Sequence, residues 1–389
     1  MSKVEELLEK YNPDGVPNKL LVECSLIDYG YPFTSSMFTD DSSYIPIIRI
    51  RDVKPGKAST YYMGNYSKEY IVKRGDILVG MDGEFNLEKW NDIDSLLNQR
   101  VARITEMPSK STKGYLYHIL GPIFKKIERE ISGGSVKHLS VKIINTISIP
   151  LPHIKVQEEI VKILDSFTNL IDALNEELSL RQKQFEYYRE KLLTFDDDVE
   201  KFIVTEVAQL KSGLTYKPSD VSDKGILVLR SSNIKNGFLS YDDNVFVKES
   251  TKISDRSIVR CNDILICVRN GSKKLVGKCA MIDKNADGMA FGAFMSVLRA
   301  KDINPKYLFY VWSSQIIQDK IKGDDAAPIN QITSKDFNRL LIPVPKEQIQ
   351  QSIVEKLDAF ESLISSLKEE IALRQKQYEY YREKLLTFD

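Results

Sequence analysis

The sequence lacks the features of a membrane protein, a disulfide-linked secreted protein or a zinc protein. No run of about 18 apolar residues occurs, so we expect no transmembrane helix and no membrane partner. The opening segment, MSKVEELLEKY, is acidic and amphipathic and has no signal-peptide centre. The cysteines are few and form no CxxC pair: Cys24, Cys261, Cys267 and Cys279. These absences favour a reducing cytoplasm over an oxidising compartment and make a metal site unexpected.

Catalytic and cofactor motifs are missing as well. There is no GxGxxG fingerprint and no GxxxxGKS/T phosphate loop. The Pro-Pro-aromatic tetrapeptide of adenine amino-methyltransferases does not occur either. Asp41, Asp52 and Lys54 loosely resemble a nuclease carboxylate pattern, but Asp52 aligns with Asn233 in the second half of the chain, where the carboxylate is gone. We therefore expect no catalytic residue and no cofactor in this chain, which favours a binding or scaffold role.

The neutral net charge conceals an uneven distribution. Residues 14–150 carry a net charge of +2 and residues 198–343 carry +5, whereas residues 152–197 and 345–389 carry −4 and −2. Positive charge therefore lies in two globular blocks and negative charge in the segments after them. This distribution permits nucleic-acid binding without requiring it.

An internal repeat is the strongest signal in the sequence. RQKQFEYYREKLLTFD (181–196) recurs as RQKQYEYYREKLLTFD (374–389), with fifteen of sixteen residues identical. Weaker matches follow in the same order, such as GDILVGMDG (75–83) with NDILICVRNG (262–271). The two halves therefore share a fold whose helical parts stayed alike while the globular parts diverged.

The repeated segments predict two long helices that pair as a coiled coil. Neither contains glycine, or proline after its first residue, and apolar residues follow a three-four spacing over five heptads. The seam comprises Leu164, Phe167, Ile171, Leu174, Leu178, Arg181, Leu357, Phe360, Ile364, Leu367, Ile371 and Arg374. An antiparallel pair separates the two seam arginines, which a parallel pair would place in one apolar layer. The alternative is that each arginine simply extends out of the seam.

The blocks between the helices predict an α+β fold with mixed α and β structure. Strands are expected at residues 44–50, 76–80, 226–230 and 263–268, and helices near residues 115–129 and 306–320. The predicted organisation has four parts: a first domain with a short N-terminal helix at 1–151, a central helix at 152–197, a second domain at 198–344 and a C-terminal helix at 345–389.

With this organisation, the chain resembles the specificity subunit of type I restriction-modification systems. The resemblance covers nearly the whole chain and rests mainly on two variable domains, each ending in a proline-bounded strand and a YYREKLL helix. The shorter phrases EKYNPDGVPNKL, FDDDVEKFIVTEV, DGEF, LLNQRVARI, FGAFMSVLR, SGGSVKHLS and AAPINQIT are also similar to segments of that family.

The resemblance implies that each target recognition domain reads one half of a split DNA site. It implies two modification (methyltransferase) subunits, which use S-adenosylmethionine to methylate adenine, and two restriction (translocase/endonuclease) subunits, which use ATP and Mg. It also implies that the helices set the spacing of the domains and dock the modification subunits. Under this interpretation the chain recognises the DNA sequence and its partner subunits catalyse the reactions.

Polar residues in loops after predicted strands are the candidates for contact with double-stranded DNA. They are Arg49, Arg51, Lys54, Lys57, Lys110, Lys113, Lys137 and His138 in the first domain, and Arg230, Asn233, Lys235, Arg269, Lys273, Lys274, Asn330 and Gln331 in the second. The bland alternative for each is a solvated surface side chain. Tyr61, Tyr62 and Tyr66 could stack on a displaced base, although core packing is the simpler expectation.

Two other functions fit parts of the sequence. One is a coiled-coil adaptor that never touches DNA. The other is a fused restriction enzyme with its own methyltransferase, whose motifs this chain lacks.

Overall fold

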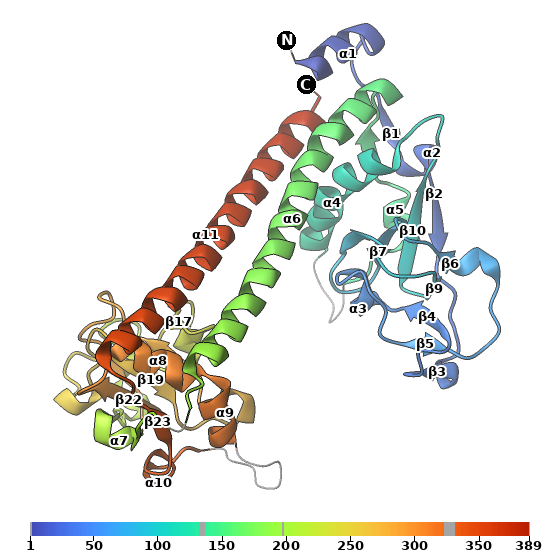
Figure 1. Ribbon diagram of the computed structural model, residues 1–389. Coiled ribbons are helices and arrows are strands. Elements are labelled where there is room, and N and C mark those ends of the chain that lie inside the picture. Colours follow the sequence, from blue (N-terminus) through green and yellow to red (C-terminus); the bar gives the residue numbers. More distant parts are fainter. Residues whose placement is uncertain (1, 132–136, 197, 323–330, 389) are drawn as a thin grey trace. The chain divides into compact units, whose positions relative to one another are not determined.

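The structure is a computed structural model that describes residues 2–131, 137–196, 198–322 and 331–388 (Figure 1). It has α+β architecture and divides into two compact units. The first unit comprises Met1–Asn175 with Glu369–Asp389, and the second comprises Glu176–Lys368. Each long helix, α6 (Ile154–Leu193) and α11 (Glu347–Leu386), is therefore shared between the two units.

The first unit is built around two sheets. One has the order β2-β10-β7-β8 and the other the order β3-β5-β4-β9-β6, while β1 pairs with β11. The strands are β1 (Asn18–Leu20), β2 (Ser25–Tyr29), β3 (Phe38–Thr39), β4 (Ile45–Ile48), β5 (Tyr61–Tyr62), β6 (Ile71–Val72), β7 (Ile77–Gly80), β8 (Leu87–Lys89), β9 (Ser95–Leu97), β10 (Val101–Glu106) and β11 (Ser148–Pro150). The helices are α1 (Lys3–Tyr11), α2 (Leu21–Cys24), α3 (Ile50–Val53), α4 (Lys113–Glu130) and α5 (Val141–Ile144), with short 3-10 turns η1 (Ser35–Met37) and η2 (Lys68–Tyr70).

The second unit repeats this plan. Its sheets have the orders β13-β22-β19-β20 and β14-β18-β15-β21, with the pairs β12-β23 and β16-β17. The strands are β12 (Lys201–Ile203), β13 (Ala208–Ser212), β14 (Val221–Ser222), β15 (Ile226–Leu229), β16 (Ile234–Lys235), β17 (Phe238–Leu239), β18 (Phe246–Val247), β19 (Ile264–Cys267), β20 (Cys279–Met281), β21 (Ala290–Phe291), β22 (Met295–Ala300) and β23 (Leu341–Pro343). The helices are α7 (Val204–Val207), α8 (Pro305–Ser313), α9 (Gln315–Lys322) and α10 (Ser334–Phe337), with 3-10 turns η3 (Pro218–Asp220), η4 (Ser231–Asn233), η5 (Asp255–Ser257) and η6 (Lys273–Leu275).

The predicted strands are confirmed as β4, β7, β15 and β19. The helix predicted near residues 115–129 is α4, which begins where the Thr112 side chain accepts a hydrogen bond from the backbone N–H of Tyr115. The helix expected near residues 306–320 is two helices, because α8 ends at Ser313 and Ser314 takes an extended backbone conformation before α9. The long helices also form, since both segments consist of strong helix formers.

Within each unit, half of one long helix packs against the opposite half of the other. In the first unit, Phe167 of α6 stacks on Tyr381 of α11 with ring centroids 5.2 Å apart. In the second unit, Tyr188 of α6 stacks on Phe360 of α11 at 5.3 Å. All twelve predicted seam residues are buried or half-buried. These contacts fit antiparallel pairing, and a regular coiled coil along the helices stays a prediction.

The seam arginines bond to their own helices. Arg181 donates to Glu177 at 3.2 Å and to Gln184 at 3.0 Å. Arg374 repeats this arrangement, donating to Glu370 at 2.7 Å and to a glutamine three residues further on. About a third of each arginine side chain is exposed. This arrangement favours the alternative in which each arginine extends out of the apolar seam.

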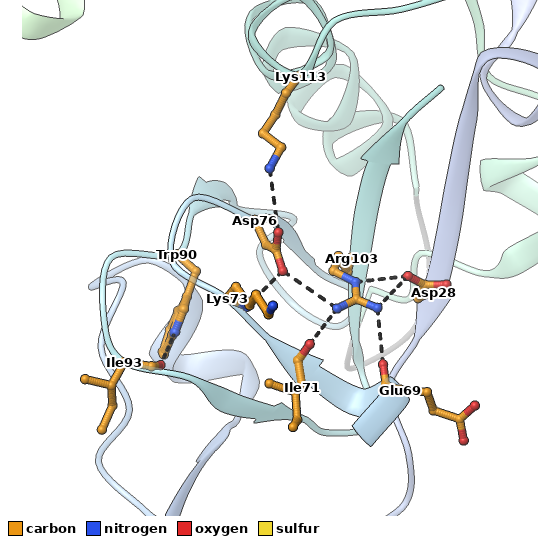
Figure 2. A network of polar contacts seen from close by, with 9 residues as sticks. All are labelled: Asp28, Glu69, Ile71, Lys73, Asp76, Trp90, Ile93, Arg103 and Lys113. Carbon is orange, nitrogen blue, oxygen red and sulfur yellow. Dashed lines mark hydrogen bonds and ion pairs between the residues drawn. The ribbon is translucent and has the colours of Figure 1, made fainter. Parts of the chain in front are cut away.

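A half-buried arginine joins the two sheets of the first unit. Figure 2 shows Arg103 of β10 donating to Asp28 of β2 at 2.9 Å and to the carbonyl oxygens of Ile71 and Glu69 at 2.7 and 3.2 Å. Its side chain is only 17% exposed. Charged hydrogen bonds of this kind are among the stronger ones, so Arg103 holds β6, and with it the second sheet, against β10.

Candidate nucleic-acid interface

The same backbone edge occurs in both units, at the end of a parallel strand pair. In the first unit Ile48 of β4 pairs with Leu97 of β9, and in the second Leu229 of β15 pairs with Phe291 of β21. An arginine follows directly in each case, Arg49 after β4 and Arg230 after β15. We call these two places the first edge and the second edge. The apolar strands end inside the core, so the residues after them project polar groups from a rigid frame.

A tight turn builds each edge. The backbone N–H of Arg49 donates to Asp52 and that of Arg230 donates to Asn233, both at 2.9 Å. Asp52 is buried and also accepts a hydrogen bond from Ser59, so its carboxylate serves this turn rather than a nuclease site. This turn explains why Asp52 and Asn233 align in the repeat.

Asn233 has a structural role instead of the predicted contact with DNA. It is fully buried, and its amide nitrogen donates to the carbonyl oxygens of Ser240 and Asp243 at 3.0 and 3.2 Å and to the side chain of Asn244 at 3.2 Å. Together with the hydrogen bond that its oxygen accepts from the backbone, the amide has partners for all its groups. Sequence reasoning placed it on the surface because it lies in a polar segment that follows a predicted strand.

Buried polar atoms without partners gather at the two edges. Among the described residues, four buried side-chain oxygen or nitrogen atoms lack a hydrogen-bond partner. Three belong to the edges: Asn98 Oδ1, which follows β9, and Arg230 Nε and Ser232 Oγ, which follow β15. The fourth is Glu106 Oε2 at the end of β10. Native proteins pair nearly all buried polar groups, so these atoms can take a partner from outside the chain, either water or a ligand.

The second edge lines a cavity of about 420 Å³. Its walls are Leu214, Thr215, Tyr216, Arg230, Ser231, Ser232, Gly292, Ala293, Phe294 and Met295. Phe294 is 59% exposed, and the Arg269 guanidinium lies over its ring at 5.3 Å from the centroid. Arg269 also forms a β-bridge with Gln331, so two predicted residues meet here. The cavity thus combines Arg230, the unpaired Ser232 hydroxyl and the Phe294 ring, over which Arg269 lies.

The first edge carries different groups at the corresponding places. Asn98 and Arg100 stand where the second edge has Gly292 and Phe294, as the strand registers show. Arg100 has a φ of 72°, a left-handed backbone conformation that is unusual for residues other than glycine. Its guanidinium lies 3.3 Å from Asp82, which also bonds His138 at 2.5 Å. His138 is therefore held beside Arg100 by a shared carboxylate.

The remaining predicted residues divide into exposed and engaged side chains. Lys57 and Lys274 are exposed, and Lys273 and Lys137 are half-exposed. Lys54 is 69% exposed and pairs with Glu84 at 3.6 Å, and Lys235 pairs with Asp242 at 2.6 Å. Arg51 donates to Thr60 at 3.1 Å. These contacts lie at the surface, where ion pairs are weak and exchange readily for other partners.

Two predicted lysines serve the fold. The ammonium group of Lys110 donates to the backbone carbonyl of Glu23 at 2.7 Å, and that of Lys113 lies 3.7 Å from Asp76 within the network of Figure 2. Asn330 lies outside the described residues. Of the tyrosines, Tyr62 is buried against Phe33 at 4.8 Å between ring centroids, whereas Tyr66 is 44% exposed. Core packing therefore accounts for Tyr62.

Sequence reasoning missed Asn98, Arg100, Ser232 and Phe294. Three of them, Asn98, Arg100 and Phe294, lie in the phrases LLNQRVARI and FGAFMSVLR, whose similarity to the family is the only signal that could have indicated them. The described cysteines are all free. In the part of the chain that the structure describes, no cluster of side chains is placed to hold a metal ion. Of the helices described there, none has the length and apolar character needed to cross a membrane.

Two repeated α+β domains with matched polar edges, joined to long shared helices, define a double recognition module. The profile of the type I restriction modification DNA specificity domain matches residues 26–180 and 196–373. The chain belongs to this family, and it is a DNA-binding specificity subunit with two target recognition domains. The resemblance drawn from the repeat is therefore confirmed.

Individual relatives agree with this assignment. The chain is 28% identical over 413 aligned residues to the type I restriction enzyme EcoR124I/EcoR124II specificity subunit of Escherichia coli, covering 100% of this chain and 97% of the relative. It is 26% identical over 387 residues to the EcoBI specificity subunit of Escherichia coli, covering 89% and 79%. A crystal structure of the type I restriction-modification S subunit from M. genitalium shares the fold, with a TM-score of 0.57, 15% identity and coverage of 95% and 96%.

Proposed function

We propose that this chain reads a bipartite DNA target, with one half-site contacted by each recognition domain. The observation that carries the proposal is the pair of matched edges. They occupy the same place in the same fold, which supports the same task. They carry different groups, Asn98 and Arg100 at one and Gly292 and Phe294 at the other, which supports two different half-sites. The domain boundaries are taken as 1–151 and 198–344, with helices at 152–197 and 345–389.

Arg49 and Arg230 are the proposed base-reading residues. The guanidinium fork matches the O6 and N7 acceptors that guanine presents in the major groove. The ion pair between Arg230 and Asp243 is 3.3 Å long, and the Asp243 side chain is 63% exposed. DNA can therefore replace this pair at small loss. No hydrogen bond or ion pair of the Arg49 side chain with another described residue occurs, which leaves its donors free for a base.

Exposed and half-exposed lysines are the proposed phosphate contacts. Lys54 and Lys57 lie a few residues after Arg49, and Lys273 and Lys274 lie on η6 after β19. Such contacts orient a protein on the duplex and give salt-dependent affinity without selecting bases. Sequence selection then falls to the arginines and their neighbours at the two edges.

The long helices are the proposed ruler and docking platform. As an antiparallel coiled coil they would set a spacer of constant length between the half-sites. They would also dock two modification subunits, which bring S-adenosylmethionine, and two restriction subunits, which bring ATP and Mg. In this scheme the chain itself is not catalytic and holds no cofactor.

DNA retention and methylome sequencing together test the proposal. The chain assembled with its modification subunit should be retained on duplex DNA and released as salt rises. Methylomes of cells with and without this chain should then differ by one bipartite motif. An adaptor that never touches DNA would give no salt-sensitive retention. A continuous motif would contradict the division into two half-sites.

A further inference from the structure

The two near-identical helix ends differ at one position, and the side chain at that position packs against the core of a unit in each case, buried at Tyr378 and partly buried at Phe185. We call residues 181–196 the central tail and residues 374–389 the C-terminal tail. The single difference is Phe185 in the central tail against Tyr378 in the C-terminal tail. The central tail packs in the second unit and the C-terminal tail packs in the first.

In the first unit, the tyrosine hydroxyl has a specific buried partner. The Tyr378 hydroxyl lies 2.9 Å from Nδ1 of His118, a residue of α4 whose side chain has no exposed surface. The other ring nitrogen of His118 lies 2.8 Å from Asp165 of α6. Tyr378 itself is only 7% exposed. Without the hydroxyl, Nδ1 of His118 would be buried with no partner.

In the second unit, the position equivalent to His118 carries a tyrosine, and the tail facing it carries a phenylalanine. Tyr310 of α8 stands where the first unit has His118, and Asp358 of α11 stands where it has Asp165. The Tyr310 hydroxyl donates to Asp358 at 2.6 Å, so its polar group already has a partner. Phe185 packs edge-on against the Tyr310 ring with centroids 6.3 Å apart. A tail hydroxyl is not needed there, and phenylalanine completes the contact.

The aromatic and cation contacts around the two positions also correspond. Arg382 lies over the Tyr378 ring at 5.1 Å, and Arg189 lies over the Phe185 ring at 5.6 Å. The stacked pairs Phe167–Tyr381 and Tyr188–Phe360 also correspond. The two substitutions, one on the tail and one on the domain, are therefore matched changes within a conserved contact.

We propose that His118 and Tyr378 form a matching pair through which the first unit accepts the C-terminal tail in preference to the central tail. The surface that α4 and α6 form in the first unit thus selects the chain's own last helix as its partner. The partner that it rejects is the central tail of a second copy of this chain, which is identical at the fifteen other positions. Without such a pair, near-identical tails would give two almost equivalent ways of pairing.

A single substitution tests the proposal, because Tyr378→Phe makes the sequence of the C-terminal tail identical to that of the central tail. In the full chain, hydrogen exchange read by mass spectrometry reports how often residues 374–388 detach. We expect opening to increase by about 5- to 150-fold, the range for a buried polar group left without a partner. The matched control is Phe185→Tyr, which converts the central tail in the opposite sense and should leave exchange at residues 181–193 close to that of the wild type.

Rescue separates a matching pair from an ordinary structural contact. The double variant His118→Tyr/Tyr378→Phe copies the tyrosine, phenylalanine and aspartate of the second unit, with Asp165 in the place of Asp358, and should return exchange at residues 374–388 to near the wild-type rate. The proposal is overturned if Tyr378→Phe does not accelerate exchange. It is equally overturned if Phe185→Tyr loosens its tail as much, or if the double variant opens as readily as Tyr378→Phe alone.

Discussion

Replacing Arg230 with alanine should relax the second half-site at one base pair and leave the first half-site unchanged. The Arg230 side chain is 38% exposed, and its ion pair with Asp243 contributes at most about 1 kcal/mol at this exposure. The unit should therefore stay folded. The loss falls on DNA recognition, because Nε of Arg230 lies in the cavity wall without a partner in the free chain.

The expected magnitude follows from the contact that the arginine can make. A bidentate arginine–guanine pair contributes about 1–3 kcal/mol of discrimination against other bases. This corresponds to a loss of selectivity of about 5- to 150-fold at that position. Arg230→Lys retains the charge and loses the fork, so it should relax the same position, whereas Lys274→Ala should weaken binding at all sequences equally.

Methylome sequencing of cells that express each variant with the modification subunit measures these effects. The fraction of sites methylated is compared for every base at every position of the motif. The reasoning is refuted if Arg230→Ala reduces methylation with the motif unchanged, which is the behaviour of a phosphate contact. It is also refuted if the first half-site changes, or if the second wild-type half-site contains no G·C pair. Arg49→Ala, the equivalent change at the first edge, should relax the first half-site only.

Four further outcomes are expected. Asn233→Ala should destabilise the second unit by at least about 2 kcal/mol in denaturant unfolding, since it removes the partners of several buried groups, and an unchanged midpoint would contradict its structural role. Arg103→Met should lower the stability of the first unit by about 1.5–3 kcal/mol, as measured in the same way, and a neutral result would show that the network of Figure 2 contributes little. Burial lowers the pKa of His118 despite the neighbouring Asp165, whose charge Lys89 partly offsets at 3.7 Å. As the pH falls, the unfolded chain therefore binds this proton before the folded chain does. The free energy of unfolding in denaturant is at its full value above about pH 6.5 and falls as the pH drops through the lowered pKa of His118 in the folded chain. The double variant His118→Tyr/Tyr378→Phe should remove this pH dependence. Inserting one heptad into both long helices adds about 10 Å and should lengthen the spacer by roughly three base pairs with both half-sites unchanged, and a motif with the original spacer would reject the ruler.

Features that depend on local or periodic pattern followed from the sequence. The duplication is visible as identity between residues 181–196 and 374–389, and it predicts two domains of one fold. The long helices followed from composition and a three-four spacing, and β4, β7, β15 and β19 from short apolar runs. The arginines at both edges were found because they stand at the ends of those predicted strands.

The composition of the edges could not be predicted, because it depends on contacts between distant segments. Arg49 meets the segment of Asn98 only because β4 and β9 run parallel, and Arg230 meets Phe294 through β15 and β21. The residue type at position 233 does not show whether the asparagine faces solvent or forms a buried turn. Hydrogen-bond satisfaction distinguishes the two cases, and it is a property of the packed unit.

The sequence alone thus determined that the chain is a duplicated pair of recognition domains with two long helices. Only the tertiary structure decided that each unit is completed by the tail of the other long helix, with Tyr378 in the first unit and Phe185 in the second. In the sequence, a single differing residue between two tails has no evident role. Its meaning depends on His118 and Tyr310, because a buried ring nitrogen needs a partner and a tyrosine already bonded to a carboxylate does not.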